Sequence, residues 1–125
     1  MTVHPNITGV VLAGGRGARM GGVDKGLVRL DGKPLVEHVL QRLQPQVPDI
    51  IISANRNHDT YARYGFAVVS DENTSDDNSY AGPLAGILSA LTHATTDYIV
   101  TVPCDAPRLP TDLAARLLLQ LQRDH

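Results

Sequence analysis

The sequence predicts an α/β fold of three layers, in which a mainly parallel central sheet is covered by helices on both faces. Short apolar runs rich in β-branched residues alternate with segments whose apolar residues recur at helical spacing, and this alternation is typical of parallel sheets. The run Ile50, Ile51 and Ile52 is apolar on both faces, as in a central parallel strand. The chain has 125 residues, of which 42% are hydrophobic and 19% charged, so we expect one domain with a modest core.

The chain opens with a predicted strand that leads into a glycine-rich loop. Residues 7–13 are apolar and few enough for a buried strand. The loop covers residues 14–26 and has five glycines in its first nine positions, with two arginines and Lys25 among or just after them. Glycine lets the backbone turn tightly and approach a ligand, and N–H groups and cations attract anions. The loop therefore predicts a phosphate site.

A hairpin and a helix are predicted next. The pair Asp31 and Gly32 suits the tight turn of a hairpin over residues 27–35. Apolar residues then recur at helical spacing over 34–43, and Pro34 suits the first turn of that helix. Two prolines shortly after this segment end the helix.

The middle of the chain predicts two further strands. Residues 49–54 form the second strand, and a short helix over 58–64 ends at Gly65. Residues 66–70 form the third strand. Residues 71–82 are polar and carry four acidic side chains, which indicates a mobile loop.

A helix, a strand and a helix complete the predicted order. From Pro83 onward, apolar residues keep the i, i+3, i+4, i+7 spacing of a helix face. Residues 98–102 form the fourth strand. Thr111 is predicted to cap the last helix, with Asp112 in its first turn.

Each predicted strand is followed by a residue suited to ligand binding. Gly14, Asn55, Asp71 and Asp105 follow the first, second, third and fourth strands. Ligands of open parallel sheets bind at the carboxyl ends of the strands. The four residues are therefore predicted to share one site.

The spacing within the loop excludes two common phosphate motifs. Met20 stands where a dinucleotide fingerprint has its third glycine, and the second strand is not followed by the acidic residue that would bind a ribose. A Walker A loop needs Gly-Lys-Ser/Thr, whereas Lys25 is preceded by Asp24 and followed by Gly26.

Residues 12–15 (Leu-Ala-Gly-Gly) and 19–26 (Arg-Met-Gly-Gly-Val-Asp-Lys-Gly) instead carry a family resemblance. Together they resemble the signature of the nucleotidyltransferases that join a nucleoside triphosphate to a phosphate or a phosphosugar. The second segment is most similar to one branch, the molybdenum cofactor guanylyltransferases. Later segments agree in the same order: Asn55-Arg56, Asp71, residues 82–86 and residues 103–107.

The resemblance implies a Rossmann-like fold of the nucleotide-diphospho-sugar transferase type. It implies transfer of GMP from GTP to the terminal phosphate of molybdenum-molybdopterin, giving molybdopterin guanine dinucleotide and pyrophosphate. It also implies partners among molybdoenzymes or other proteins of cofactor biosynthesis. Because this family continues beyond the present length, we expect residues 1–125 to be a single nucleotide-binding domain, the N-terminal part of a longer protein.

Three charged residues are expected to carry the chemistry. Asp105 would hold Mg²⁺, which needs only one or two carboxylates beside phosphate oxygens and waters. Lys25 and Arg19 would lie along the phosphates and stabilise charge on the leaving group. These three residues are the predicted catalytic set, and Asp105 is the predicted metal ligand.

Further residues are expected to bind the nucleotide. The backbone of residues 12–15 would line the base and ribose, and Ser53, Asn55 and Asp71 would select the guanosine end. A carboxylate can accept two hydrogen bonds from guanine. With Gly82, which the resemblance adds, the predicted nucleotide-binding residues are Leu12, Ala13, Gly14, Gly15, Lys25, Ser53, Asn55, Asp71, Gly82 and Asp105.

Bulk properties exclude several other classes. A net charge of −2 gives no broad basic face for nucleic acid. The sequence shows no membrane-spanning stretch and no signal pattern. Cys104 is the single cysteine and cannot form an internal disulfide, so we expect a reducing cytoplasm and a packed thiol. The five histidines lack metal-ligand spacing and are assigned no role.

Two alternative functions stay open from the residues alone. One is a different nucleotidyltransferase, which would use CTP or build a nucleotide sugar. The other is a non-catalytic nucleotide-binding module that delivers a cofactor to a target enzyme. Nucleotide preference separates the first from GMP transfer, and release of pyrophosphate separates the second.

Overall fold

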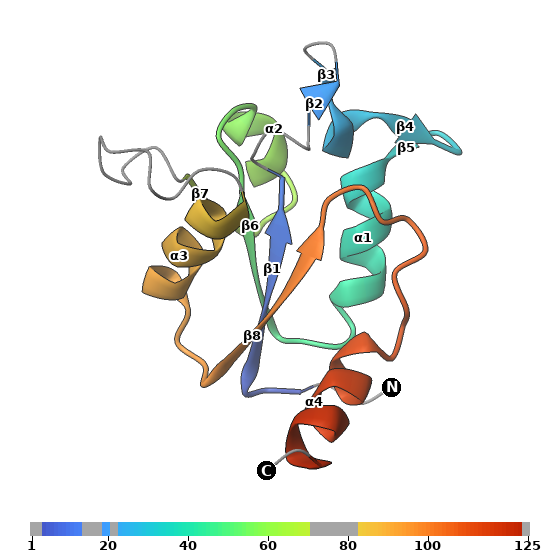
Figure 1. Cartoon of the computed structure of the whole chain (residues 1–125). Coiled ribbons are helices and arrows are strands. Elements are labelled where there is room, and N and C mark those ends of the chain that lie inside the picture. The colour runs from blue at the N-terminus through green and yellow to red at the C-terminus, as the bar shows by residue number, and fades with distance from the viewer. Residues whose placement is uncertain (1–3, 14–18, 21–22, 71–82, 124–125) are drawn as a thin grey trace.

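The computed structural model describes residues 4–13, 19–20, 23–70 and 83–123. Its centre is a four-stranded sheet with strand order β7-β6-β1-β8, and every neighbouring pair in this sheet is parallel. The predicted α/β fold with a parallel central sheet is therefore confirmed (Figure 1). The four strands of the sheet are β1 (Ile7–Leu12), β6 (Asp49–Ser53), β7 (Ala67–Val69) and β8 (Tyr98–Pro103).

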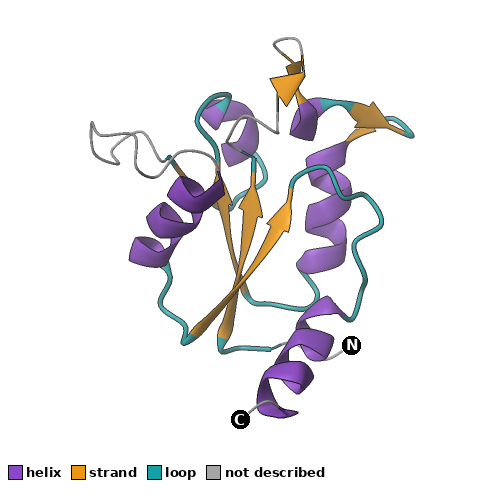
Figure 2. Cartoon of the chain, viewed as in Figure 1, coloured by secondary structure: helices purple, strands orange, loops and turns teal. Residues whose placement is uncertain are grey.

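Helices cover both faces of the sheet, as Figure 2 shows. One face packs against two helices, and the larger apolar cluster joins Val11 and Ile52 of the sheet to Val39 and Ala114 of these helices. On the other face, Val10 packs with buried side chains that include one from the third long helix. These helices are α1 (Leu35–Leu43) and α4 (Leu113–Arg123) on the first face and α3 (Pro83–His93) on the second.

The direction in which the chain adds strands to the sheet reverses beside β1. From β1 the chain passes to β6 and then outward to β7, and it returns to the opposite side of β1 as β8. The carboxyl ends of β1 and β8 therefore flank the point at which the order reverses, where open α/β sheets bind their ligands. The short helix α2 (His58–Ala62) and the small hairpins gather at this carboxyl edge (Figure 1).

The predicted hairpin over 27–35 is confirmed. Strand β4 (Arg29–Leu30) pairs antiparallel with β5 (Lys33–Pro34). The turn residues Asp31 and Gly32 both have positive φ, 54° and 82°. These angles are those of the turn that best matches the twist of two hairpin strands, which explains the Asp-Gly pair.

The segment 14–26 was predicted as one loop, and this prediction is wrong for its second half. Strand β2 (Arg19–Met20) pairs antiparallel with β3 (Val23–Asp24), and a 3₁₀ helix follows at Lys25–Leu27. The Asp24 carboxylate starts the 3₁₀ helix because its Oδ1 accepts the N–H of Gly26 at 3.1 Å. Lys25 therefore sits in regular structure.

The start of α4 is capped differently from the prediction. The N–H of Arg116 binds the carbonyl of Asp112, and the N–H of Ala114 binds Oε1 of Gln46 at 2.9 Å. Gln46 comes from the turn after α1 and is 2% exposed. Thr111 was predicted to supply this cap, so the prediction is wrong, because a residue distant in sequence takes the position.

Replacing Gln46 with alanine is expected to lower the free energy of unfolding by about 2 kcal/mol. The side chain also donates from Nε2 to the carbonyls of Arg42 at 2.7 Å and Pro110 at 3.0 Å, and its loss leaves buried groups without partners. Urea unfolding measures the effect. Gln41→Ala is the matched control, because Gln41 is exposed and bonds to Lys33 at the surface, and its change should stay within about 0.5 kcal/mol. Equal losses in both variants would contradict the bridging role.

In the part of the chain that the structure describes, no helix has both the length and the apolar character needed to cross a bilayer.

Candidate functional site

The carboxyl edge brings together the ends of three neighbouring strands. Leu12, the last residue of β1, lies in register with Ser53 of β6 on one side and Pro103 of β8 on the other. Cys104 and Asp105 follow directly after β8. The ends of the first, second and fourth predicted strands therefore meet at one edge of the sheet, and Asn55 and Asp105 follow two of these ends.

Lys25 and Asp105 form the charged centre of this edge. The Lys25 Nζ lies 3.8 Å from Asp105 Oδ2, and the two side chains are 31% and 34% exposed. This separation is longer than a hydrogen bond, so the pair is held close by charge while both groups keep access to solvent. A cation and a carboxylate so placed can serve an anionic ligand and a metal ion on adjacent sides.

Asp24, next to Lys25, is a buried carboxylate with three donors around it. It is only 7% exposed. Its Oδ1 accepts the Gly26 N–H and, at 2.8 Å, the hydroxyl of Tyr61, while Oδ2 accepts Nδ2 of Asn57 at 3.1 Å. Charge buried in this way is tolerated because hydrogen bonds replace water. The network joins the 3₁₀ helix to α2.

Asp24, Tyr61 and Asn57 were missed as site residues by the sequence reasoning. Asp24 carried a signal, because it stands inside the glycine-loop motif beside Lys25. Tyr61 and Asn57 lie 37 and 33 residues further along, and only the fold brings them to the motif. Burial and the Asp24 carboxylate raise the pKa of the Tyr61 hydroxyl above its ordinary value, so this hydroxyl stays a donor.

Gly26 allows the 3₁₀ helix to pack closely on the end of β8. A Cβ at this position would lie 2.6 Å from the Tyr61 hydroxyl oxygen and 3.2 Å from Cβ and Sγ of Cys104. Only glycine fits this contact without a shift of its neighbours. The residue after Lys25 is thus packed against the residue before Asp105.

The backbone at the end of β1 is partly engaged within the sheet. The N–H of Ala13 donates to the carbonyl of Ser53 at 2.7 Å, and the carbonyl of Leu12 accepts the N–H of Cys104 at 3.2 Å. The Ser53 residue is 2% exposed. A nucleotide contact by Leu12 or Ala13 would therefore use atoms other than the Leu12 carbonyl oxygen and the Ala13 N–H.

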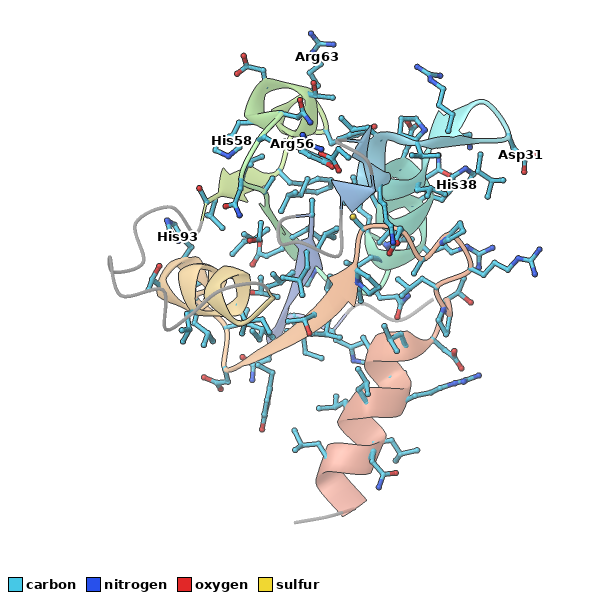
Figure 3. All side chains as sticks on the ribbon, turned by 45° about the horizontal axis from the view of Figure 1, so that its top comes forward. Asp31, His38, Arg56, His58, Arg63 and His93 are labelled. Atoms are coloured by element: carbon cyan, nitrogen blue, oxygen red, sulfur yellow. The ribbon has the colours of Figure 1, made fainter. Side chains whose placement is uncertain are left out.

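Asn55 links the ends of β6 and β7. The Ser70 hydroxyl donates to Oδ1 of Asn55 at 3.2 Å, and both residues are half-buried. The neighbouring Arg56 lies on the loop before α2, and in Figure 3 it lies toward the centre of the carboxyl edge, with His58 beside it. The segment after β6 therefore carries an amide and a guanidinium at the carboxyl edge of the sheet.

Several predicted site residues lie outside the described residues. Gly14, Gly15, Asp71 and Gly82 belong to this group. Arg19 is described as part of β2, where its backbone is paired with Asp24. This backbone pairing puts β2 next to the 3₁₀ helix that carries Lys25.

The carboxylate of Asp105 suits a hard divalent cation that also binds phosphate. Across the described ranges, no three histidine, cysteine, aspartate or glutamate side chains form a metal-binding group. His38, His58 and His93 point to separate parts of the molecule (Figure 3). One half-exposed carboxylate fits Mg²⁺, which takes its remaining ligands from phosphate oxygens and water.

Cys104 is expected to react slowly with iodoacetamide. Burial and the nearby carboxylates of Asp105 and Asp24 raise the pKa of its thiol to about 12, and the thiolate is the reactive form. At pH 8 the folded chain should label more than about a hundredfold more slowly than the unfolded chain. The rate should keep rising with pH up to 10. Mass spectrometry follows this one thiol, and a plateau near pH 9 would contradict the raised pKa.

Known proteins resemble this chain both in sequence and in structure. A molybdenum cofactor guanylyltransferase of Shewanella sp. (strain MR-4) is 53% identical over 116 residues, which cover 93% of this chain and 57% of that protein. The chain thus spans little more than half the length of this curated relative. The crystal structure of molybdopterin-guanine dinucleotide biosynthesis protein A from Archaeoglobus fulgidus matches with a TM-score of 0.66 at 26% identity, over 94% of this chain and 56% of that one.

A further solved structure shares the fold. It is the manganese complex of a Mycobacterium tuberculosis H37Rv protein, which matches with a TM-score of 0.63 at 22% identity and covers 94% of this chain and 59% of that one. The family model of the MobA-like NTP transferase domain matches residues 9–125. This match includes all four strands of the sheet from Gly9 onward and the Lys25–Asp105 pair, and it shows that the chain belongs to the MobA-like NTP transferase domain family.

Proposed function

We propose that this chain binds GTP with a divalent cation and transfers GMP to the terminal phosphate of molybdenum-molybdopterin. The products are molybdopterin guanine dinucleotide and pyrophosphate. The family match and the names of relatives at about 50% identity support this proposal. The observation that carries it is the Lys25–Asp105 pair, 3.8 Å apart at the carboxyl edge, beside the point where the strand order reverses.

The proposed reaction is an in-line displacement at the α-phosphorus of GTP. An oxygen of the acceptor phosphate forms the new P–O bond, and the bond to the bridging oxygen of pyrophosphate breaks. Such transfers need little covalent chemistry from the protein, and catalysis comes from positioning and charge. The negative charge leaves on pyrophosphate, so cations beside the phosphates favour the step.

The proposal divides the predicted site residues between the phosphates and the guanosine of GTP. Lys25 binds the phosphates and stabilises charge on the leaving group, and we assign the same role to Arg19 of β2. Asp105 would hold Mg²⁺, which when bound would neutralise phosphate charge during the transfer. We assign Ser53, Asn55 and Asp71 to the guanosine end, as the sequence predicts.

The test is a titration of the full chain with GTP, CTP, ATP and UTP in the presence of Mg²⁺. Selective binding of GTP, followed by release of pyrophosphate when molybdenum-molybdopterin is added, supports GMP transfer. Equal affinity for CTP would overturn the choice of guanosine. Selective binding of GTP without pyrophosphate release would favour a module that delivers a cofactor, and it would overturn the proposed catalysis.

A further inference from the structure

We infer that Tyr61 is a positioning residue, which holds Lys25 against Asp105 through the buried carboxylate of Asp24. The inference rests on the proposed function for its kinetic consequence, and on the geometry of the free chain for the rest. Tyr61 is fully buried in α2, and its hydroxyl donates to Asp24 Oδ1 at 2.8 Å.

The first step of the argument is the position of Asp24. This residue directly precedes Lys25 and ends β3, so its carboxylate fixes the backbone from which the lysine side chain extends. Two of its three hydrogen bonds come from outside its own segment, from Tyr61 and Asn57. The short pairing of β2 with β3 alone is a weak anchor. The bonds to α2 therefore tie the base of Lys25 to the main domain.

The second step is the length of the lysine side chain. Lysine carries its charge on a flexible four-carbon stem, so its ammonium is placed accurately only when the backbone below is fixed. Lys25 and Asp105 keep 3.8 Å between charged atoms although each side chain is about a third exposed. A hydrogen bond to an ionised group is stronger than a neutral one, so loss of the Tyr61 hydroxyl should loosen this backbone.

The third step is the packing of the Tyr61 hydroxyl beside Gly26, next to the Lys25–Asp105 pair. The Tyr61 hydroxyl oxygen also bounds the space beside Gly26, where an added Cβ would approach it to 2.6 Å. The same space is bounded by Cys104, the neighbour of Asp105. One hydroxyl thus bonds to Asp24, the residue before Lys25, and bounds the space beside Gly26, the residue after it. Gly26 in turn packs against Cys104 at the end of β8. This packing fixes the backbone positions from which the side chains of Lys25 and Asp105 extend toward each other.

The test replaces Tyr61 with phenylalanine, which removes the hydroxyl and keeps the ring. We expect kcat/KM for GMP transfer to fall about tenfold, since small misplacements of charged groups reduce rates strongly. In a Lys25→Ala background the same replacement should change kcat/KM less than about twofold, because both changes act on one interaction. An equal loss in both backgrounds would show that Tyr61 acts only on the fold and would overturn the inference.

A second readout does not depend on activity. The chain has two lysines, Lys25 and Lys33, so labelling with [¹³C]lysine gives two Cε signals that a Lys33→Arg variant assigns. Tyr61→Phe should lower the order parameter of the Lys25 signal and leave that of Lys33 unchanged. An unchanged Lys25 signal would overturn the inference, whatever the kinetics.

Tyr64→Phe is the matched control. Tyr64 lies one turn further along, is half-buried, and donates to Glu37 at 3.4 Å rather than to Asp24. It should change neither the Lys25 signal nor kcat/KM. If the unmodified chain neither binds GTP nor releases pyrophosphate, the proposed function fails, while the lysine signals alone still decide whether Tyr61 positions Lys25.

Discussion

Replacing Asp105 with asparagine is expected to lower the rate of GMP transfer by about 10³-fold. The change keeps the shape of the side chain and removes the charge that would hold the divalent cation. It also removes the partner of Lys25, whose ammonium lies 3.8 Å from Oδ2. The rate is measured as pyrophosphate released from GTP in the presence of molybdenum-molybdopterin. A second measurement, the dependence of GTP affinity on Mg²⁺ concentration, should become nearly flat.

Asp112→Asn is the control for the Asp105 variant. Asp112 is an exposed carboxylate that is also paired with a cation, Arg116, at 2.8 Å, but it lies at the start of α4, away from the carboxyl edge. Its loss should leave turnover unchanged and cost less than about 1 kcal/mol of stability. Circular dichroism should show a folded chain in both variants. Full turnover and unchanged Mg²⁺ dependence in Asp105→Asn would exclude a metal role for this residue.

The fold followed from the sequence because its signals are local. The three isoleucines of β6 and the Asp31-Gly32 turn depend on residues close together in the chain, and both were predicted correctly. The cap of α4 was predicted wrongly, because Gln46 reaches Ala114 across 68 positions. No local pattern marks a glutamine as a cap for a distant helix, since the side chain becomes a partner only after the two segments pack.

The candidate site, like the fold, has a part that the sequence predicts and a part that it does not. The Lys25–Asp105 pair could be anticipated, because the end of a parallel strand has a known place in the sheet and the glycine loop follows β1 directly. The support beneath Lys25 could not be anticipated. Its members Tyr61 and Asn57 come from α2 and the residue before it, whose sequence shows only an ordinary short helix. Topology thus predicts which ends meet, whereas side-chain partners depend on packing that topology does not specify.

Replacing Gly26 with alanine is expected to lower the free energy of unfolding by about 3 kcal/mol, at the upper end of the cost of overpacking. The new Cβ would lie 2.6 Å from the Tyr61 hydroxyl oxygen and 3.2 Å from Cβ and Sγ of Cys104. These neighbours are fully or almost fully buried, so they have little room to move. The displaced 3₁₀ helix should also carry Lys25 away from Asp105. Urea unfolding measures the first effect and GTP affinity the second.

Two comparisons show whether steric contact causes the loss. Gly32→Ala meets no atom within 4 Å but has φ +82°, so it measures the backbone cost alone, about 1 kcal/mol. Tyr61→Phe removes the nearest atom. In the Gly26→Ala background, the loss of unfolding free energy that Tyr61→Phe causes should become smaller or turn into a gain, because the ring without its hydroxyl leaves space for the methyl group. Strictly additive losses in the double variant would show that the hydroxyl and the methyl group do not compete for this space. They would also contradict the close packing through which the 3₁₀ helix at Lys25–Leu27 is fixed to the end of β8.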